Sequence, residues 1–392
     1  MRRVYFDNNA TSPLLPDVME AMRPYFMEKF GNASSIHQVG QQARAAVEEA
    51  REHVAGLLGA RPTEVVFTSG GTEGDNLAIF GLAQPGDHVI TTTVEHHAVL
   101  NACHQLEQRG VDVTYVPVDE QGMVDLERLK GALRPTTKLI SVMMANNETG
   151  VLQPVEEIGR IAAEADVYFH TDAVQAAGKV PLDVKRIGCD LLTIAAHKMH
   201  GPQGVGALYV RKGTLLHPMM YGGRHERSRR AGTENVPGIV GLGKAAELAK
   251  RWFAEGGPEK MSAMRDRLER TITSSLEMTS VNSGNAARTP NTSNIIFECI
   301  EGEAFVIAMD LKGVAVSTGA ACSSGAIEPS HVLTAMGLTP EQARGSIRFS
   351  LGKQNTEEEV DFVLERVPEV LGKLRELSPV WKKTTAAKSL SF

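Results

Sequence analysis

Seven short apolar runs between residues 64 and 210 limit what this chain can fold into. Each run predicts a β-strand, and stretches that favour helix separate the runs. The runs lie at residues 64–68, 88–93, 112–118, 138–144, 167–171, 190–195 and 205–210. Strands that alternate with helices form a mostly parallel sheet. The pattern therefore predicts an α/β fold, in which a mostly parallel sheet is flanked by helices.

The length of 392 residues indicates two domains. A glycine- and proline-rich break at residues 256–258 predicts the boundary between them. We expect a large domain at residues 15–257 and a smaller α+β domain built from residues 1–14 and 258–380. Residues 381–392 have little apolar surface to bury, so we expect a disordered tail there.

Two stretches carry strong helix signals. Residues 41–58 are rich in helix formers and show a buried stripe. Residues 356–359 form a capping box that opens an amphipathic helix. The apolar face of that second helix carries Val360, Val363, Leu364 and Val367.

Lys198 stands between the apolar run at 190–195 and a segment rich in glycine and proline. An isolated lysine after a strand is most often solvated. A lysine amine that is partly desolvated at a strand end becomes a usable nucleophile, as in enzymes that keep a Schiff-base lysine for a carbonyl cofactor. The motifs upstream favour this second interpretation.

Gly70, Gly71 and Thr72 follow the run at 64–68 and open a helix. The glycines allow the backbone to approach an anion closely, and free N–H groups at the helix start favour a phosphate. Many such turns merely connect a strand to a helix. The turn matches neither a P-loop nor a dinucleotide-binding motif.

Polar residues end three further runs. Asp172 is placed to pair with a protonated pyridine nitrogen or to cap the next helix, and Gln175 to contact a ring oxygen. Asn147 follows the run at 138–144. His96 and His97 follow the run at 88–93 without the spacing of a metal site, so an aromatic ring stacked on a cofactor is favoured. Ligands bind where parallel strands end, and this convergence predicts a pyridoxal 5'-phosphate (PLP) site.

Together these motifs resemble the cysteine desulfurases of the NifS/IscS group, which belong to the class-V aminotransferases among the fold-type I PLP enzymes. The resemblance extends through residues 5–11 (YFDNNAT), 30–37 (FGNASSIH) and 345–351 (GSIRFSL), and only the last dozen residues fall outside it. Residues 221–226 and 378–381 look closer to the nitrogenase-linked NifS branch.

The resemblance implies a role for each site residue. Lys198 would link covalently to PLP, His96 would stack on the ring and help move protons, Asp172 would pair with the ring nitrogen, and Gln175 would contact the ring oxygen. Gly71, Thr72 and His197 would hold the phosphate, with Thr233 from the other subunit of a homodimer. Asn147, close to the cofactor, and Arg348 would hold the substrate carboxylate. Ala195 stands where many relatives carry a phosphate-binding serine.

Cys322 lies in a run of small residues, 317–326 (STGAACSSGA), that predicts a mobile surface loop. A lone cysteine is most often a small core residue, but these neighbours offer no core. The segment resembles the long-loop class of the family, in which this cysteine accepts sulfur as a persulfide. The family also implies that Cys322 is a metal ligand in a transient cluster shared with a scaffold protein.

The function implied is conversion of L-cysteine to L-alanine, with sulfur passed through Cys322 to an iron–sulfur scaffold, including a role in nitrogenase maturation. A selenocysteine lyase or another PLP β-lyase is an alternative that would tolerate loss of Cys322. A non-catalytic assembly partner with the same fold is another.

The composition limits the remaining possibilities. A net charge of −6 argues against a general nucleic-acid binder. An arginine cluster at 224, 227, 229 and 230 is either a solvated loop or a site for phosphate or an acidic partner. The four cysteines form no Cys-x-x-Cys pair, which favours reduced thiols and a cytoplasmic location. We see neither a signal peptide nor a membrane span.

Overall fold

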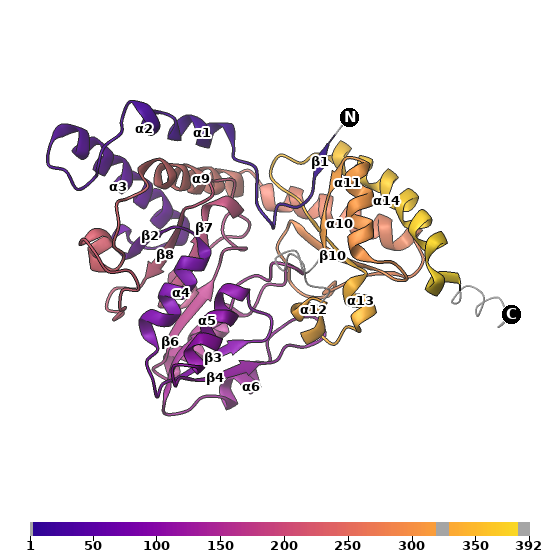
Figure 1. Cartoon of the computed structure of the whole chain (residues 1–392), viewed down its shortest axis with the longest axis horizontal. Helices are drawn as coiled ribbons and strands as arrows, with labels where there is room; N and C mark the ends of the chain where they lie inside the picture. The colour runs from indigo at the N-terminus through magenta and orange to yellow at the C-terminus, as the bar shows by residue number, and fades with distance from the viewer. Residues whose placement is uncertain (1–2, 319–328, 383–392) are drawn as a thin grey trace.

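The computed structural model describes residues 3–318 and 329–382 (Figure 1). Its larger sheet has seven strands in the order β2-β8-β7-β6-β5-β3-β4. Strands β7, β6, β5, β3 and β4 pair in parallel, whereas β8 runs antiparallel to both of its neighbours, β2 and β7. The bounds are β2 (Val65–Thr68), β3 (His88–Thr92), β4 (Asp112–Val116), β5 (Thr137–Ser141), β6 (Tyr168–Asp172), β7 (Leu191–Ala195) and β8 (Gly206–Val210). The predicted α/β fold with a mostly parallel sheet is confirmed.

One predicted strand is shorter than its apolar run. The run at 138–144 ends as a strand at Ser141. Beyond that point the N–H of Met143 donates to the carboxylate of Glu95, 3.0 Å away, instead of to a neighbouring strand. The N–H groups of Val142 and Met144 still donate to His170 and Asp172 of β6, so on that side the segment stays beside the sheet as it approaches Asn147.

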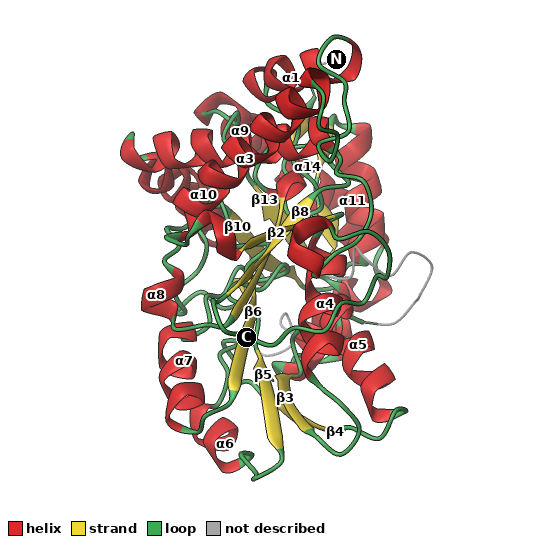
Figure 2. Ribbon diagram, turned by 90° about the vertical axis from the view of Figure 1, so that its left-hand side faces the viewer, coloured by secondary structure: helices red, strands yellow, loops and turns green. Residues whose placement is uncertain are grey.

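Helices cover both faces of this sheet, which Figure 2 shows between them. Alternate strand residues point to opposite faces, so Val66 packs with α4 and α5 while Val65 and Phe67 pack with α3 and α9. The helices are α1 (Pro16–Met22), α2 (Pro24–Met27), α3 (Gln38–Leu58), α4 (Gly71–Leu82), α5 (His97–Glu107), α6 (Leu126–Gly131), α7 (Val155–Glu164), α8 (Val184–Ile187) and α9 (Val236–Ala254). Short 3₁₀ turns occupy Pro62–Glu64, Ala196–Lys198 and His225–Ser228.

The C-terminal part of the chain builds a second sheet with its own core. Its four antiparallel strands, in the order β12-β13-β10-β9, are β9 (Thr279–Val281), β10 (Thr292–Phe297), β12 (Ser317–Thr318) and β13 (Ser346–Ser350). Its helices are α10 (Gly257–Ser275), α11 (Gly302–Leu311), α12 (His331–Ala335), α13 (Pro340–Arg344) and α14 (Glu357–Leu377). Thr356 and Glu359 form the expected capping box, and Val360, Val363 and Val367 are buried.

At the break predicted at 256–258, two residues, Glu255 and Gly256, separate α9 from α10. Gly256 has a φ of 70°, a left-handed conformation that glycine adopts without strain. The predicted tail begins with two described residues, of which Trp381 lies with its ring 4.4 Å from the Arg375 guanidinium. The rest of that tail lies outside the described residues. Within the described ranges no helix is both long and apolar enough to cross a membrane.

The N-terminal arm crosses from one sheet to the other (Figure 1). Strand β1 (Val4–Tyr5) pairs with β11 (Val314–Ala315), and Val4 and Phe6 are buried in the second core. Further on, the backbone N–H of Ser12 donates to the carbonyl of His197, 2.8 Å away, beside the larger sheet. Residues 7–11 therefore lie between the two sheets, next to Lys198.

Candidate active site

Predicted site residues gather at one edge of the larger sheet. Strands of a parallel sheet end at the same edge, where ligands bind. The glycine turn follows β2, His96 follows β3, Asn147 follows β5, Asp172 ends β6, and Lys198 lies in the 3₁₀ turn after β7. The sequence pattern therefore places these side chains near one another without any long-range information.

The amine of Lys198 contacts the N-terminal arm. Its Nζ donates to the carbonyl oxygens of Asn9 and Ala10, at 2.6 and 2.7 Å. The positive charge of Lys198 is one cause, after burial, of the lowered pKa values of His96 and His197. The amine is thus held at a fixed point of the site by acceptors that the sequence motifs did not indicate.

Asp172 is buried at the end of β6. Its Oδ1 accepts a hydrogen bond of 2.8 Å from the N–H of Val174 in the following turn. The next helix, α8, begins only at Val184 and is capped by Asp183, so Asp172 does not cap it. Burial raises the pKa of the Asp172 carboxyl to about 6, against the opposing effects of that hydrogen bond and of Lys198. A buried carboxylate of this kind suits a protonated ring nitrogen, whose charge offsets the cost of burial.

The turn after β2 is built for close approach of an anion. Gly70 has a φ of 156°, a conformation that side chains rarely allow. A Cβ on Gly71 would lie 2.8 Å from Cγ2 of Val174, so this position has no room for a side chain. The turn leads into α4, a helix of 12 residues whose free N–H groups favour a phosphate.

Two further positions bear on phosphate binding. Burial, followed by Lys198, lowers the pKa of His197 to about 4, so this ring is neutral at neutral pH. His197 Nδ1 lies 3.1 Å from Thr11 Oγ1. Ala195 is buried and brings no hydroxyl group, so any phosphate hydrogen bond at this position is lost.

His96 begins α5 as its N-cap. Its Nδ1 accepts a hydrogen bond of 3.1 Å from the N–H of Ala98, which leaves the proton of the neutral ring on Nε2. Burial, Lys198 and the neighbouring histidines lower its pKa to about 4. A neutral ring of this kind is suited to stack on a cofactor. His97 is exposed and lies 4.7 Å from His331, ring centre to ring centre, and the described residues hold no group of three or more metal-ligating side chains.

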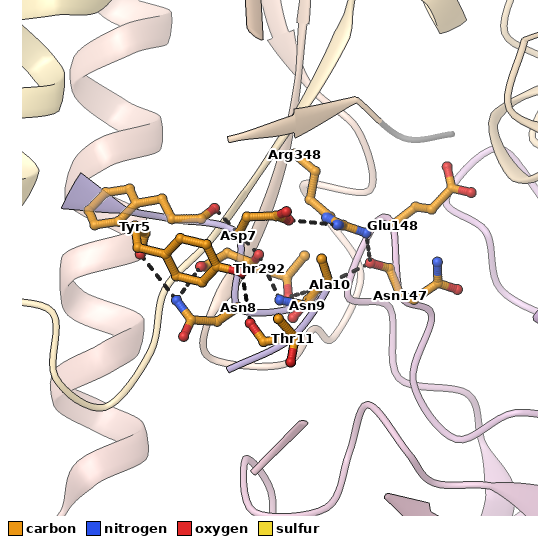
Figure 3. A network of polar contacts seen from close by, with 12 residues as sticks. Tyr5, Asp7, Asn8, Asn9, Ala10, Thr11, Asn147, Glu148, Thr292 and Arg348 are labelled. Carbon is orange, nitrogen blue, oxygen red and sulfur yellow. Dashed lines mark hydrogen bonds and ion pairs between the residues drawn. The ribbon is translucent and has the colours of Figure 1, made fainter. Parts of the chain in front are cut away.

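Arg348 on β13 closes the site from the second sheet (Figure 3). Its NH1 donates to the carbonyl of Asn147 at 2.9 Å, and its NH2 donates to Asp7 Oδ1 at 2.8 Å. Its buried Nε has no hydrogen-bond partner among the described residues. A buried guanidinium with a donor to spare fits a substrate carboxylate. Asn147 contacts the Arg348 guanidinium through its backbone carbonyl oxygen.

Asn9 joins the predicted site residues, and sequence reasoning assigned it no role. It is 2% exposed and takes part in seven hydrogen bonds with other described residues. Its partners are Asn147, Gln175, Lys179, Lys198, Asn291, Thr292 and Ser350. Residues 5–11 supported the family resemblance, and that was the sole signal available in the sequence.

Thr233 and the arginine cluster lie on the loop before α9. Thr233 is exposed and lines a cavity of about 240 Å³ together with Ser69 of the glycine turn. Arg230 donates to Glu73 Oε1 at 2.8 Å, and Glu73 Oε2 accepts from the N–H of Ser69 at 2.7 Å. Arg230 therefore braces the glycine turn through Glu73, a role that neither interpretation of the cluster foresaw.

Glu95 ties the ends of β3 and β5 together beside His96. It is fully buried, accepts a hydrogen bond of 2.7 Å from Thr92, and accepts two of 3.0 Å from the N–H of Met143. Burial outweighs these hydrogen bonds and raises its pKa from 4.5 to about 8. Glu95 is another residue that the motifs missed, because its partner Met143 is distant in sequence, just beyond the end of β5.

The raised pKa of Glu95 predicts a pH-dependent stability. Folding takes up a proton here, so the stabilisation is complete below about pH 4.5 and is lost as the pH rises toward 8. We expect Glu95→Gln to flatten the decline of the unfolding free energy between pH 5 and 8, by about 1 kcal/mol per pH unit at most. Urea unfolding at several pH values measures both slopes. Equal slopes in the two proteins would contradict the assignment.

The site offers partners for three polar parts of PLP. The amine of Lys198 suits the aldehyde, the glycine turn suits the phosphate, and Asp172 suits the ring nitrogen. Arg348, with its unpaired Nε, leaves a place for a substrate carboxylate beside them. With the mostly parallel sheet, this arrangement defines a PLP-dependent enzyme of fold-type I.

The chain belongs to the aminotransferase class-V family, whose model matches residues 4–363. It is 50% identical to the cysteine desulfurase IscS of Dictyoglomus turgidum, over 97% of this chain and 98% of the relative. A solved NifS-like protein, 40% identical, superposes with a TM-score of 0.89 and covers 95% of this chain and 100% of its own. The structure of SspA in complex with cysteine is 39% identical over 90% of this chain and 100% of its own, with a TM-score of 0.80. These relatives confirm the family predicted from the sequence.

Proposed function

We propose that this protein is a cysteine desulfurase, which converts L-cysteine to L-alanine and takes the sulfur onto Cys322. Cys322 lies outside the described residues, but the segments on either side of it are described. On one side, Ser317 of β12 pairs with Arg348 in the second sheet. On the other side, Ser330 donates a hydrogen bond of 2.5 Å to Glu148, the neighbour of Asn147. The segments on both sides of Cys322 therefore lie at the substrate-carboxylate end of the site, and this observation carries the proposal.

Arg348 and Asn147 bind the carboxylate of L-cysteine and thereby orient its Cα toward Lys198. PLP, when bound, supplies an aldehyde that takes the substrate amine and a ring that stabilises negative charge at Cα. Lys198 would hold the cofactor through its amine and would move the Cα proton of the bound substrate. Asp172 would hold the ring nitrogen in its protonated form, Gln175 would contact the ring oxygen, and His96 would cover the ring. Gly71, Thr72 and His197 would bind the phosphate.

Cys322 completes the reaction as a nucleophile. Its thiolate attacks the substrate sulfur, so that a sulfur–sulfur bond forms while the bond between sulfur and Cβ breaks. The electron pair of the broken bond stays with the carbon fragment, which takes up protons and leaves as L-alanine. The persulfide then passes its sulfur to an acceptor, which we propose is an iron–sulfur scaffold protein, with Cys322 as a transient cluster ligand.

We further propose a homodimer in which Thr233 reaches the phosphate of the partner's site. Highly exposed apolar side chains support a subunit contact, among them Met27, Ile36 and Tyr221. The separate core of the second sheet supports the division into a large domain, 15–257, and a small one, 1–14 with 258–380. A cytoplasmic location and a role in nitrogenase maturation stay predictions from cysteine content and from resemblance.

The release of products from L-cysteine tests the function. With PLP and a reductant, we expect the native protein to release alanine and sulfide in equal amounts. The Cys322→Ser variant is expected to lose at least about tenfold in rate, because the serine hydroxyl does not accept sulfur. A Cys103→Ser variant is a matched control, since that thiol is buried in the core between α5 and the sheet.

Two other outcomes would favour the alternatives. If Cys322→Ser keeps the native rate, the protein releases sulfur directly, as a selenocysteine lyase or another β-lyase would, and selenide release from L-selenocysteine distinguishes these. If the native protein binds PLP but releases no product, the desulfurase assignment is wrong. A purified protein that does not take up PLP at all would support a non-catalytic assembly partner.

A further inference from the structure

Lys179 is a buried lysine that the proposed reaction does not use. It is 6% exposed, and its Nζ donates to Gln175 Oε1 at 2.6 Å and to Asn9 Oδ1 at 3.0 Å. Both acceptors are neutral amides, so neither offsets the cost of burying a charge. Burial, followed by the charges of Lys198 and Arg348, lowers the pKa of Lys179 well below its usual value. A lysine in so unfavourable a place needs a reason to be there.

Its contact with Gln175 fixes the orientation of the Gln175 amide. An amide has one end that accepts hydrogen bonds and one that donates them, whereas a lysine amine presents N–H donors. Because Lys179 holds Oε1, the NH₂ end of Gln175 must face the opposite way. There it donates to the carbonyl oxygen of Asn9 at 3.0 Å, and the same oxygen accepts from Lys198 Nζ at 2.6 Å. The NH₂ group of Gln175 and the amine of Lys198 therefore donate to the same oxygen, the backbone carbonyl of Asn9.

We propose that Lys179 is a positioning residue for the cofactor, which holds Gln175 with its NH₂ group toward the covalent link at Lys198. The proposal rests on the proposed function, in which Gln175 contacts the ring oxygen beside that link. A donor there stabilises negative charge on the oxygen and so favours loss of the proton from the nitrogen of the link. Without Lys179 the amide is free to turn its oxygen toward the ring, and the link holds its proton to higher pH.

The other charged and titratable groups around Lys179 and Lys198 must be considered in any pH measurement. These groups are Arg348, Asp172, His96, His197 and His200. The three histidines have pKa values lowered to about 4 by burial, so they stay neutral above pH 5. The pKa of Asp172 is about 6 before a ring nitrogen pairs with it. Glu95 and Lys353 have pKa values of about 8, so a change in titration above pH 7 is assigned to the link and Lys179 by comparison with the Lys353→Met control.

The visible absorbance of bound PLP, followed against pH, tests the proposal without measuring turnover. We expect Lys179→Met and Gln175→Leu each to raise the apparent pKa of the link by about one pH unit, the scale of one hydrogen bond. The double variant should shift no further than either single one, because both changes remove the same contact. Lys179→Gln, whose amide nitrogen falls one bond short of Gln175, repeats the test with a polar side chain if the methionine variant folds poorly.

Lys353→Met is the matched control for charge. Lys353 is a half-buried lysine whose Nζ is buried, but this Nζ lies 4.9 Å from the centre of the Trp252 ring and has no hydrogen-bond partner among the described residues. This variant should leave the absorbance titration unchanged. An equal shift in Lys353→Met would mean that loss of any nearby positive charge suffices, and would overturn the positioning role.

The variants also separate the failure of this inference from that of the proposed function. If Gln175→Leu shifts the titration and the Lys179 variants do not, the Gln175 contact stands and the role of Lys179 is wrong. If none of them shifts it, the contact between Gln175 and the ring oxygen is wrong as well. If the double variant shows the sum of two separate shifts, Lys179 acts independently of Gln175, and the inference fails.

Discussion

Replacing Lys198 with methionine is expected to lower kcat/KM for L-cysteine by about 10⁴-fold or more and to abolish covalent attachment of PLP. The amine serves both as the point of attachment and as the group that moves the Cα proton, and proton transfer by a positioned group is alone worth about 10²–10⁴-fold. Alanine release measures the first effect. Borohydride reduction followed by peptide mapping measures the second, with PLP expected on the peptide that contains Lys198.

Lys179 makes this a demanding test, because its amine, like that of Lys198, donates a hydrogen bond to Asn9 and lies in the same site. If reduction of the Lys198→Met variant traps PLP on Lys179, or if turnover survives, the assignment of the nucleophile is wrong. Lys353→Met controls for the loss of a lysine with a buried amine, and it should keep both attachment and turnover.

Arg348→Met is expected to raise KM for L-cysteine by about 10²–10³-fold, with a smaller change in kcat. Removing one partner of a buried charge pair costs about 3–5 kcal/mol, and each 1.4 kcal/mol corresponds to tenfold in binding. In the variant, the negative charge of Asp7 would face the substrate carboxylate, because the guanidinium that now lies 2.8 Å from Asp7 Oδ1 is gone. Steady-state kinetics, together with the concentration of L-alanine needed to change the PLP spectrum, measure the loss.

Arg375→Met is the matched control for this change. Arg375 is also buried, but it donates to the carbonyl oxygens of Met278 and Glu298 at the far side of the second sheet. It should lower stability and leave KM unchanged. A normal KM in Arg348→Met would show that the carboxylate binds elsewhere.

The sheet and the residues at its edge were predictable because their signals are local. A strand-like run and the polar residue that ends it are neighbours in sequence, so Asp172 and Lys198 were found from the residues alone. Arg348 was different, since nothing near it in the sequence indicates a carboxylate site, and it came from the family resemblance. Its place opposite Asn147 depends on how the second sheet meets the first, which no local pattern encodes.

The residues that hold the site together were missed for the same reason. Asn9 and Lys179 are 170 residues apart, and each is an ordinary polar residue until the other is placed beside it. Glu95 stands next to His96 in the sequence, but its partner Met143 is 48 residues away, just beyond the end of β5. A buried polar network has no periodicity, so neither hydrophobic pattern nor motif spacing reveals it.

The N-terminal arm also sets when the site can form during protein synthesis. Asn9 is synthesised well before Ser350, which accepts a hydrogen bond from its N–H and is made 341 residues later. At about 5–20 residues per second, the arm waits roughly 20–70 s for that partner. The larger sheet is complete in sequence well before then, but the carbonyl groups that hold Lys198 are not yet fixed. Full assembly of the cofactor site therefore requires that β13 has been made, and a ribosome that stalls before β13 leaves a protein without a complete site.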